Sequence, residues 1–148
     1  MFIPDCFLNP ADGTTYLDYF ALGRYKISVS SGCAKSVSGT KIVVSALNTF
    51  RGQARAYGTF DNYYNGYQLM DYSMATVYTL LSVLYLKTSN SQRVFSGTEV
   101  WTYELTGSTE NIATLNGKNN QNAYRLLGIE NPTGNYGVLL DGLYNQNN

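Results

Sequence analysis

Acidic side chains are the first candidates for chemistry in this 148-residue sequence, because it contains no histidine. The commonest general base, the usual zinc ligand and the Ser-His triad are therefore missing. Glu99 and Glu104 are an odd number of residues apart, so an unbulged strand places them on opposite faces. No catalytic spacing joins the acids near predicted turns, helix ends and strand ends, namely Asp61, Asp71, Glu99, Glu104, Glu130 and Asp141. We expect no catalytic residues and no enzymatic activity.

Oxygen donors in the loops are the groups that could hold a metal ion. Carboxylate and amide oxygens are ligands that calcium prefers. The spacing of an EF-hand loop is absent, and asparagine is common in turns because it tolerates left-handed backbone. The donors considered are Asp61, Asn62, Asn111, Asn119, Asn120 and Asp141. We expect no metal site and no cofactor, and structural calcium stays an alternative that the spacing does not support.

Tyrosine, with 14 copies, is the residue type in surplus. Mixed with small polar residues it suits recognition surfaces, because its ring gives wide contact area at little entropic cost. The same composition is typical of sugar-binding surfaces, and equally of a β surface with no binding role. Because loops carry recognition more often than core strands, we place the candidate ligand-binding residues in two loops. They are Asp61, Asn62, Tyr63, Tyr64, Tyr67, Asp141, Tyr144 and Asn145.

Charge and hydropathy exclude other classes of function. Ten basic residues balance ten acidic ones, which argues against nucleic-acid binding, since that needs a surplus of Lys and Arg. The longest apolar stretch, 74–86, is shorter than the roughly 20 residues of a membrane span, so we expect no membrane insertion. The first residues lack the pattern of a secretory signal. Cys6 and Cys33 are expected to be free, buried thiols.

Two helices must position these loops. Apolar residues spaced by three or four predict a short helix at about 46–57 and a long one over 71–87. Apolar side chains surround the long helix so widely that most of its circumference, including Tyr78 and Tyr85, is expected to be buried.

Short extended runs surround the two predicted helices. Alternation predicts a strand at 24–30, a turn at Ser31-Gly32 and an antiparallel partner at 41–44, and the polar stretch 116–122 is expected to be a solvent loop. Further strands are expected at 100–105, 124–129 and 136–140. This order predicts the α+β class, with long loops. Residues 1–15 are expected to form a lead-in arm that could dock on a neighbour, and residues 16–148 the domain.

One block resembles a known family. Residues 128–135 read Gly-Ile-Glu-Asn-Pro-Thr-Gly-Asn, and 140–142 read Leu-Asp-Gly. This block is similar to one in C-type-lectin-like domains of bacteriophage tail and other virion proteins. These domains are related to the variable proteins of diversity-generating retroelements and to the formylglycine-generating-enzyme fold. Residues 22–26, 49–58 and 71–92 resemble the opening strand and the two helices of the same family.

The sequence departs from the family in two ways. Residues 136–140 contain no tryptophan, whereas family members usually carry tryptophans there. The family also continues well beyond the Asp-Gly pair, while this sequence ends at Asn148. The resemblance therefore implies a fold that is abbreviated, completed by another chain, or continued in a longer protein. Cys6 and Cys33 do not match the cysteines of the enzymatic branch, so oxidase activity is not implied.

The resemblance implies a non-enzymatic virion component, such as a tail, fibre or surface-decoration protein, assembled in the host cytoplasm. Its expected role is assembly, with host-receptor attachment as a second role. Expected partners are other virion proteins, further copies of the chain and a glycan or protein of the host surface, because repeated subunits build virions and symmetric homo-oligomers are common. The alternative is a carbohydrate-binding or adhesin module on a bacterial surface.

Overall fold

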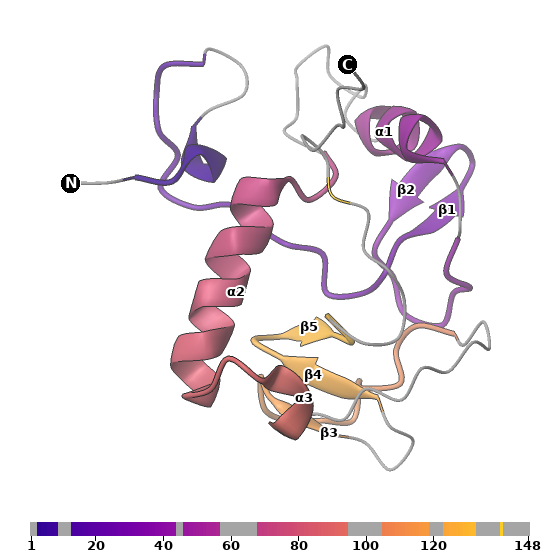
Figure 1. Ribbon diagram of the computed structural model, residues 1–148. Helices are drawn as coiled ribbons and strands as arrows, with labels where there is room; N and C mark the ends of the chain where they lie inside the picture. Colours follow the sequence, from indigo (N-terminus) through magenta and orange to yellow (C-terminus); the bar gives the residue numbers. More distant parts are fainter. Residues whose placement is uncertain are drawn as a thin grey trace, which may run out of the picture.

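The computed structural model describes residues 3–8, 13–43, 46–56, 68–94, 105–118, 123–132 and 140. Over these residues the protein is an α+β structure, as the sequence predicts, with helices beside two small antiparallel sheets (Figure 1). The helical elements are η1 (Asp5–Phe7, a 3₁₀ helix), α1 (Leu47–Ala56), α2 (Tyr72–Leu86) and α3 (Ser91–Val94). The strands are β1 (Ser28–Ser30), β2 (Cys33–Lys35), β3 (Gly117–Lys118), β4 (Tyr124–Leu126) and β5 (Ile129–Glu130).

Helix α1 packs against the β1–β2 hairpin (Figure 1). Its observed bounds differ by one residue at each end from the predicted 46–57, so the predicted helix is confirmed. Phe50 and Ala54 point from one helical face into a cluster with Leu69, and all three are buried. This apolar cluster fixes α1 on the hairpin.

The β1–β2 hairpin has the predicted turn but not the predicted partner. Ser31 and Gly32 have φ angles of 53° and 76°, the left-handed conformation that two-residue hairpin turns require. Such a turn returns the chain at once, so the strand that pairs with β1 is β2 and the predicted pairing was wrong. Of the predicted partner 41–44, residues 41–43 are described; they are not assigned to a strand, and Val43 donates one backbone hydrogen bond of 3.1 Å to the carbonyl of Ile27. Of the predicted strand 24–30, the structure assigns residues 28–30 to β1.

Helix α2 is flanked by a charged residue at each end. Asp71 is the N-cap, and its Oδ1 accepts a hydrogen bond of 2.7 Å from the backbone N–H of Met74. Lys87 is the C-cap in left-handed conformation, with φ of 53°. The predicted helix at 71–87 is therefore confirmed.

The predicted burial of α2 is wrong. Leu80, Leu81, Leu84 and Tyr85 are all more than half exposed. The helix contacts η1 and α3. Ser73 accepts a hydrogen bond from the backbone N–H of Cys6, and Tyr78 donates one to β4. The apolar side chains around α2 are therefore not all buried, although their distribution predicted that they would be.

The segment 124–129, predicted as one strand, is a β-hairpin. Leu127 and Gly128 form its two-residue turn, with φ angles of 49° and 84°. Leucine seldom adopts positive φ, so the sequence carries no ordinary signal for this turn. Backbone N–H groups of the turn are held from outside: Leu127 donates to Asn116 Oδ1 at 2.7 Å and Gly128 to the carbonyl of Leu115 at 2.9 Å.

Three other predicted segments are described in part. Gly117 and Lys118 form β3 beside β4, so this portion of 116–122 is not a solvent loop. Of the predicted strand 100–105, Leu105 is described and bridges Lys41. Of 136–140, the structure describes Leu140.

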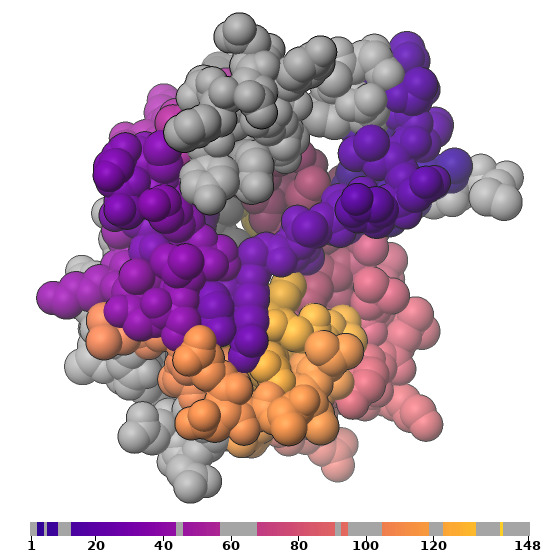
Figure 2. All heavy atoms as spheres, turned by 180° about the vertical axis from the view of Figure 1, so that it is seen from behind, coloured from indigo at the N-terminus to yellow at the C-terminus, as the bar shows by residue number. Residues whose placement is uncertain are grey.

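The described part of the amino-terminal segment packs on its own chain. Leu8 forms an antiparallel bridge with Tyr16, and the rings of Phe7 and Phe20 meet edge to face at 5.0 Å between centroids. Figure 2 shows the segment that follows, in indigo and violet, crossing the molecule as a band between α2 and the β4–β5 hairpin on one side and the β1–β2 region on the other.

Both cysteines are free, as predicted, although burial is confirmed for Cys6 alone, because Cys33 is half-buried. Within the described ranges, none of the helices combines the length and the hydropathy needed to cross a membrane.

Candidate functional site

The residues predicted to bind a ligand lie outside the described residues: Asp61, Asn62, Tyr63, Tyr64, Tyr67, Asp141, Tyr144 and Asn145. Glu99 and Glu104 do so as well. Asp71 and Glu130 are described, and the structure gives each of them hydrogen bonds within the fold. Among the described residues, cysteine, aspartate and glutamate side chains form no cluster of three or more potential metal ligands.

Glu130 lies at the end of β5 and is 3% exposed. Its Oε1 accepts a hydrogen bond of 2.9 Å from the backbone N–H of Gly107. Its Oε2 accepts two from Thr109, at 2.8 Å from the backbone N–H and 2.7 Å from the hydroxyl. The backbone N–H of Glu130 donates to the carbonyl of Arg24 at 2.8 Å. We call Glu130, Gly107, Thr109 and Arg24 the Glu130 clamp, because it joins three distant segments of the chain.

Arg125 is the buried cation next to the clamp. It is the strand partner of Glu130 in the β4–β5 register, and its Nη2 donates to the carbonyls of Ile112 and Thr114. The carboxylate of Glu130 and the guanidinium of Arg125 are thus both engaged inside the fold. A carboxylate held by three fixed donors is suited to joining segments rather than to exchanging protons with a substrate.

Arg24 connects the clamp to the surface. Its guanidinium carbon lies 5.0 Å from the ring centroid of Tyr25, and its Nη2 donates to the carbonyl of Thr109 at 3.4 Å. The Tyr25 hydroxyl donates to Glu110 Oε1 at 3.1 Å. Burial, reinforced by this hydrogen bond, raises the pKa of Tyr25. Hydrogen bonds from Ser38 and Tyr25 lower the pKa of the exposed Glu110 carboxyl.

A groove of about 560 Å³ lies between the 18–24 segment, α2 and the β4–β5 turn. We call it the aromatic groove, because its lining includes Phe7, Tyr19, Phe20 and Tyr78 beside the charged Asp18 and Arg24. Its volume falls within the range of roughly 300–1,000 Å³ that is typical of ligand pockets.

Each aromatic side chain of the groove has a distinct environment. Phe7 and Phe20 contact each other, so their rings form one wall. The hydroxyl of Tyr78 donates to the carbonyl of Leu126 at 2.8 Å, and burial raises its pKa, so it stays a protonated donor. Tyr19 is 79% exposed at the rim. The groove therefore combines a fixed aromatic wall with a ring that is open to contact.

This arrangement suits binding. Aromatic faces pack against sugar rings and apolar side chains, while Asp18 can accept and Arg24 can donate hydrogen bonds that orient a ligand. Among the described lining residues, Asp18 is the one carboxylate, and paired-acid hydrolysis needs two.

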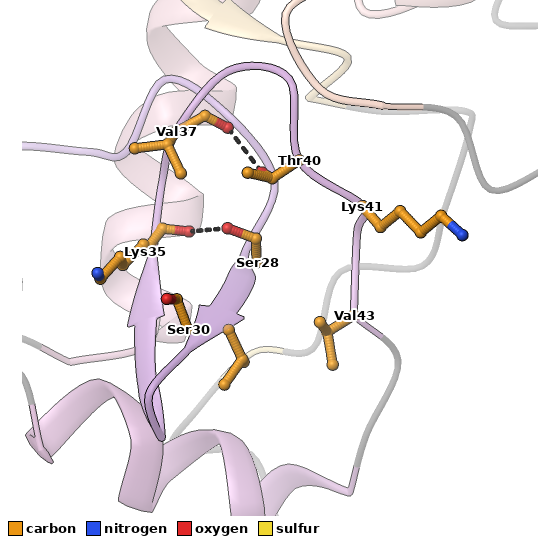
Figure 3. Close-up of a pocket in the computed structure, with 8 residues that line it drawn as sticks. Ser28, Ser30, Lys35, Val37, Thr40, Lys41 and Val43 are labelled. Carbon is orange, nitrogen blue, oxygen red and sulfur yellow. Dashed lines mark hydrogen bonds between the residues drawn. The ribbon is translucent and has the colours of Figure 1, made fainter.

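A second hollow, of about 500 Å³, lies between the β1–β2 hairpin and residues 37–43 (Figure 3). Its hydroxyls are engaged with backbone carbonyls: Ser28 donates to Lys35 at 3.3 Å and Thr40 to Val37 at 3.0 Å. Figure 3 shows Lys35 and Lys41 extending in opposite directions, so their ammonium groups do not converge on one ligand. The aromatic groove is therefore the better candidate.

Sequence reasoning missed the aromatic groove because its residues come from four separate segments. A signal was present in the 16–22 segment, where Tyr19 and Phe20 are aromatic residues ahead of the first strand. Period-two alternation starts after them, so they were not assigned to an element.

Comparison of the chain with known proteins gives no match to a family model, a curated protein or a solved structure. The resemblance of residues 128–135 to C-type-lectin-like domains stays a prediction from sequence. The functional argument therefore depends on the geometry of the groove and of the clamp beside it.

Proposed function

We propose that this protein is a non-enzymatic recognition and assembly component of a bacteriophage virion, with a C-type-lectin-like fold. The sequence block 128–135 supports the family, and its described part contributes Gly128 to the β4–β5 turn and Glu130 to the Glu130 clamp. Residues 49–58 and 71–92, which resemble the two helices of that family, overlap α1 and α2, and this overlap supports the proposal. Partners of this component are other virion proteins and a glycan or protein of the host surface.

The aromatic groove is the observation that carries the recognition role. A rigid wall built on Phe7, Phe20 and Tyr78 costs little entropy on binding, because these side chains are already fixed by packing and hydrogen bonds. The exposed ring of Tyr19 adds contact area at the rim. The groove requires no metal or cofactor for this role.

A glycan array with the purified protein, together with binding to intact host cells, tests recognition. Substitution Tyr19→Ala is expected to lower affinity at least ~10-fold, since aromatic anchors dominate such contacts. Tyr16→Ala is the matched control, because Tyr16 is also an exposed tyrosine but does not line the groove. Equal loss from both variants, or no binding to any glycan or cell, would refute the recognition role of the groove.

Antibody labelling of purified phage particles tests the assembly role. Particles from the host that carries the gene should be labelled at one fixed position. Labelling of the bacterial surface without labelling of particles would instead favour a bacterial adhesin, the alternative that the groove also supports.

A further inference from the structure

The segment 18–24 forms one side of the aromatic groove and resembles a strand at the edge of a sheet. Between residues 19 and 23 it contains no helix or turn, and it crosses the molecular surface (Figure 2). Half-buried residues that line the groove alternate with exposed ones, in the order Phe20, Ala21, Leu22, Gly23 and Arg24. This alternation has the period of two that is typical of a β-strand.

The backbone of this segment has unused hydrogen-bonding groups. The carbonyl of Arg24 accepts a hydrogen bond of 2.8 Å from the backbone N–H of Glu130 in β5. Within the part of the chain that the structure describes, the backbone groups of residues 18–23 form no hydrogen bond. In a strand, alternate residues direct their N–H and C=O groups to the same side. Phe20 and Leu22 therefore direct theirs to the side on which Arg24 meets β5.

An unpaired edge beside an apolar groove suits an extended peptide that binds as an additional strand, because main-chain hydrogen bonds give affinity and alternate side chains give specificity. The described lining favours a peptide over a glycan. Besides the aromatic rings it is largely aliphatic, with Leu22, Val77, Leu81, Leu127 and Ile129. The hydroxyls of a sugar would lose water against these side chains without gaining hydrogen bonds.

The two charged residues of the segment lie at its opposite ends. Asp18, which is exposed, and Arg24 are six residues apart, about 20 Å in an extended chain. Within the described residues, the Arg24 guanidinium donates to a neutral acceptor, the carbonyl of Thr109, and its buried Nε–H has no partner. The nearby Glu110 carboxylate accepts from Tyr25. These charges are complementary to a peptide with an acidic residue at one end and a basic residue at the other.

We propose that the aromatic groove binds an extended segment of another protein, which pairs antiparallel with residues 18–24. The inference rests on the proposed recognition role of the groove and narrows its partner to a protein. Antiparallel pairing, the more stable kind, places an acidic residue opposite Arg24 and a basic residue opposite Asp18. Apolar residues lie opposite Leu22 and Phe20. The recognised pattern is therefore acid-x-apolar-x-apolar-x-base.

Fluorescence anisotropy of labelled peptides with the purified full chain tests the proposal. The probes are the peptides Glu-Thr-X-Thr-X-Thr-Lys, in which X is each of Phe, Tyr, Leu, Val and Ile in turn. At least one should bind with a dissociation constant below ~100 μM. The same peptide in reversed order should bind at least ~10-fold more weakly, because like charges then face each other.

A charge exchange tests the register. Asp18→Lys should weaken binding of the best peptide ~10-fold, and replacing the terminal Lys of that peptide by Glu should restore the affinity. Because Asp18 is exposed, the variant should stay folded, which circular dichroism checks. A merely structural effect of Asp18→Lys would not be reversed by a change in the peptide.

N-methylation of the best peptide tests the backbone pairing. Methyl groups on the amides of the two X residues should lower affinity at least ~10-fold, because these N–H groups face Leu22 and Phe20. Methyl groups on the Thr residue that precedes each X should change affinity less than ~3-fold, because those N–H groups point away. This peptide is the matched control.

Three outcomes overturn the proposal: no probe peptide binds, the reversed peptide binds as tightly, or both methylation patterns weaken binding equally. A chain that binds a glycan through Tyr19 but none of the peptides keeps the recognition role of the groove and overturns the peptide inference. Loss of glycan, cell and peptide binding together contradicts both.

Discussion

Around Glu130 polar side chains are buried, whereas along α2 several leucines and tyrosines are exposed. Glu130 is 3% exposed and Thr109 is fully buried, yet Leu84 is 73% exposed. The two regions are neighbours, because the Tyr78 hydroxyl of α2 donates to the carbonyl of Leu126 in β4. Buried hydrogen bonds thus supplement the apolar clusters in joining segments of the chain, while part of the apolar surface of α2 is exposed.

This contrast indicates that hydrogen bonds can stabilise a region in which short strands bury little apolar surface. The strands β3, β4 and β5 have two or three residues each, so their own ladders are short. The Glu130 clamp adds bonds from two other segments. Each donor would be left unsatisfied in a buried position without the carboxylate, which makes the clamp costly to break.

The largest expected effect is the loss of the clamp carboxylate. Glu130→Ala should lower the free energy of unfolding by about 3 kcal/mol, because three donors, two of them on the buried Thr109, lose their acceptor. Urea denaturation measures this loss. Glu110→Ala, which removes an exposed acid, is the control and should cost less than ~1 kcal/mol. Similar costs for the two variants would show that the clamp does not hold the fold.

Alanine substitutions at Leu126 and Leu84 distinguish a core position from a surface position by their cost in stability. Leu126→Ala should cost ~2–5 kcal/mol, because Leu126 is 2% exposed. Leu84→Ala should stay within ~0.5 kcal/mol of wild type when measured on dilute, monomeric protein. Urea midpoints of both variants check this. A large loss at Leu84 under those conditions would mean that α2 is core on both sides.

Lys26 illustrates the free-energy cost of placing a charged group away from water. Burial lowers its pKa from 10.5 to about 8, so the folded chain binds fewer protons than the unfolded chain between these values. Stability therefore rises with pH across this window, and the full cost applies below pH 8. Lys26→Met should stabilise the protein by ~1–2 kcal/mol at pH 7, from ~1.4 kcal/mol per pKa unit discounted for partial exposure.

Urea denaturation of wild type and Lys26→Met at several pH values measures this difference. The advantage of the variant should shrink as pH rises from 8 to 10. An advantage that does not change with pH would assign the effect to packing and not to the buried charge.

The smallest expected effect is at the contact between the two regions. Tyr78→Phe should cost ~1 kcal/mol, because it removes the donor to the carbonyl of Leu126. Tyr85→Phe, at an exposed tyrosine of the same helix, should leave thermal stability unchanged. If the two variants behave alike, this hydrogen bond does not join α2 to the hairpin.

Local patterns predicted the elements that depend on nearby residues. The bounds of α1 and α2 and the Ser31-Gly32 turn follow from apolar spacing and turn chemistry within a few residues. These features need no knowledge of distant contacts, which is why the sequence indicates them.

Features that depend on distant partners were not predictable. Whether the apolar surface of α2 is buried depends on what packs against it, and its periodicity cannot show that. The burial of Glu130 depends on Gly107 and Thr109, more than 20 residues earlier in the chain. Leu127, with positive φ, lies in a turn whose backbone N–H groups donate to Asn116 Oδ1 and to the carbonyl of Leu115, both more than ten residues away. The aromatic groove likewise exists only once four segments meet.

Hydroxyl-radical footprinting of the purified protein tests most directly the claim that leucines and tyrosines of α2 are exposed while the side chains of β4 are buried. Leu84, Tyr85 and Leu115 should be modified, while Tyr124 and Leu126 stay protected. Protection of Leu84 and Tyr85 equal to that of Tyr124 would contradict the account, because α2 would then be buried in its own chain.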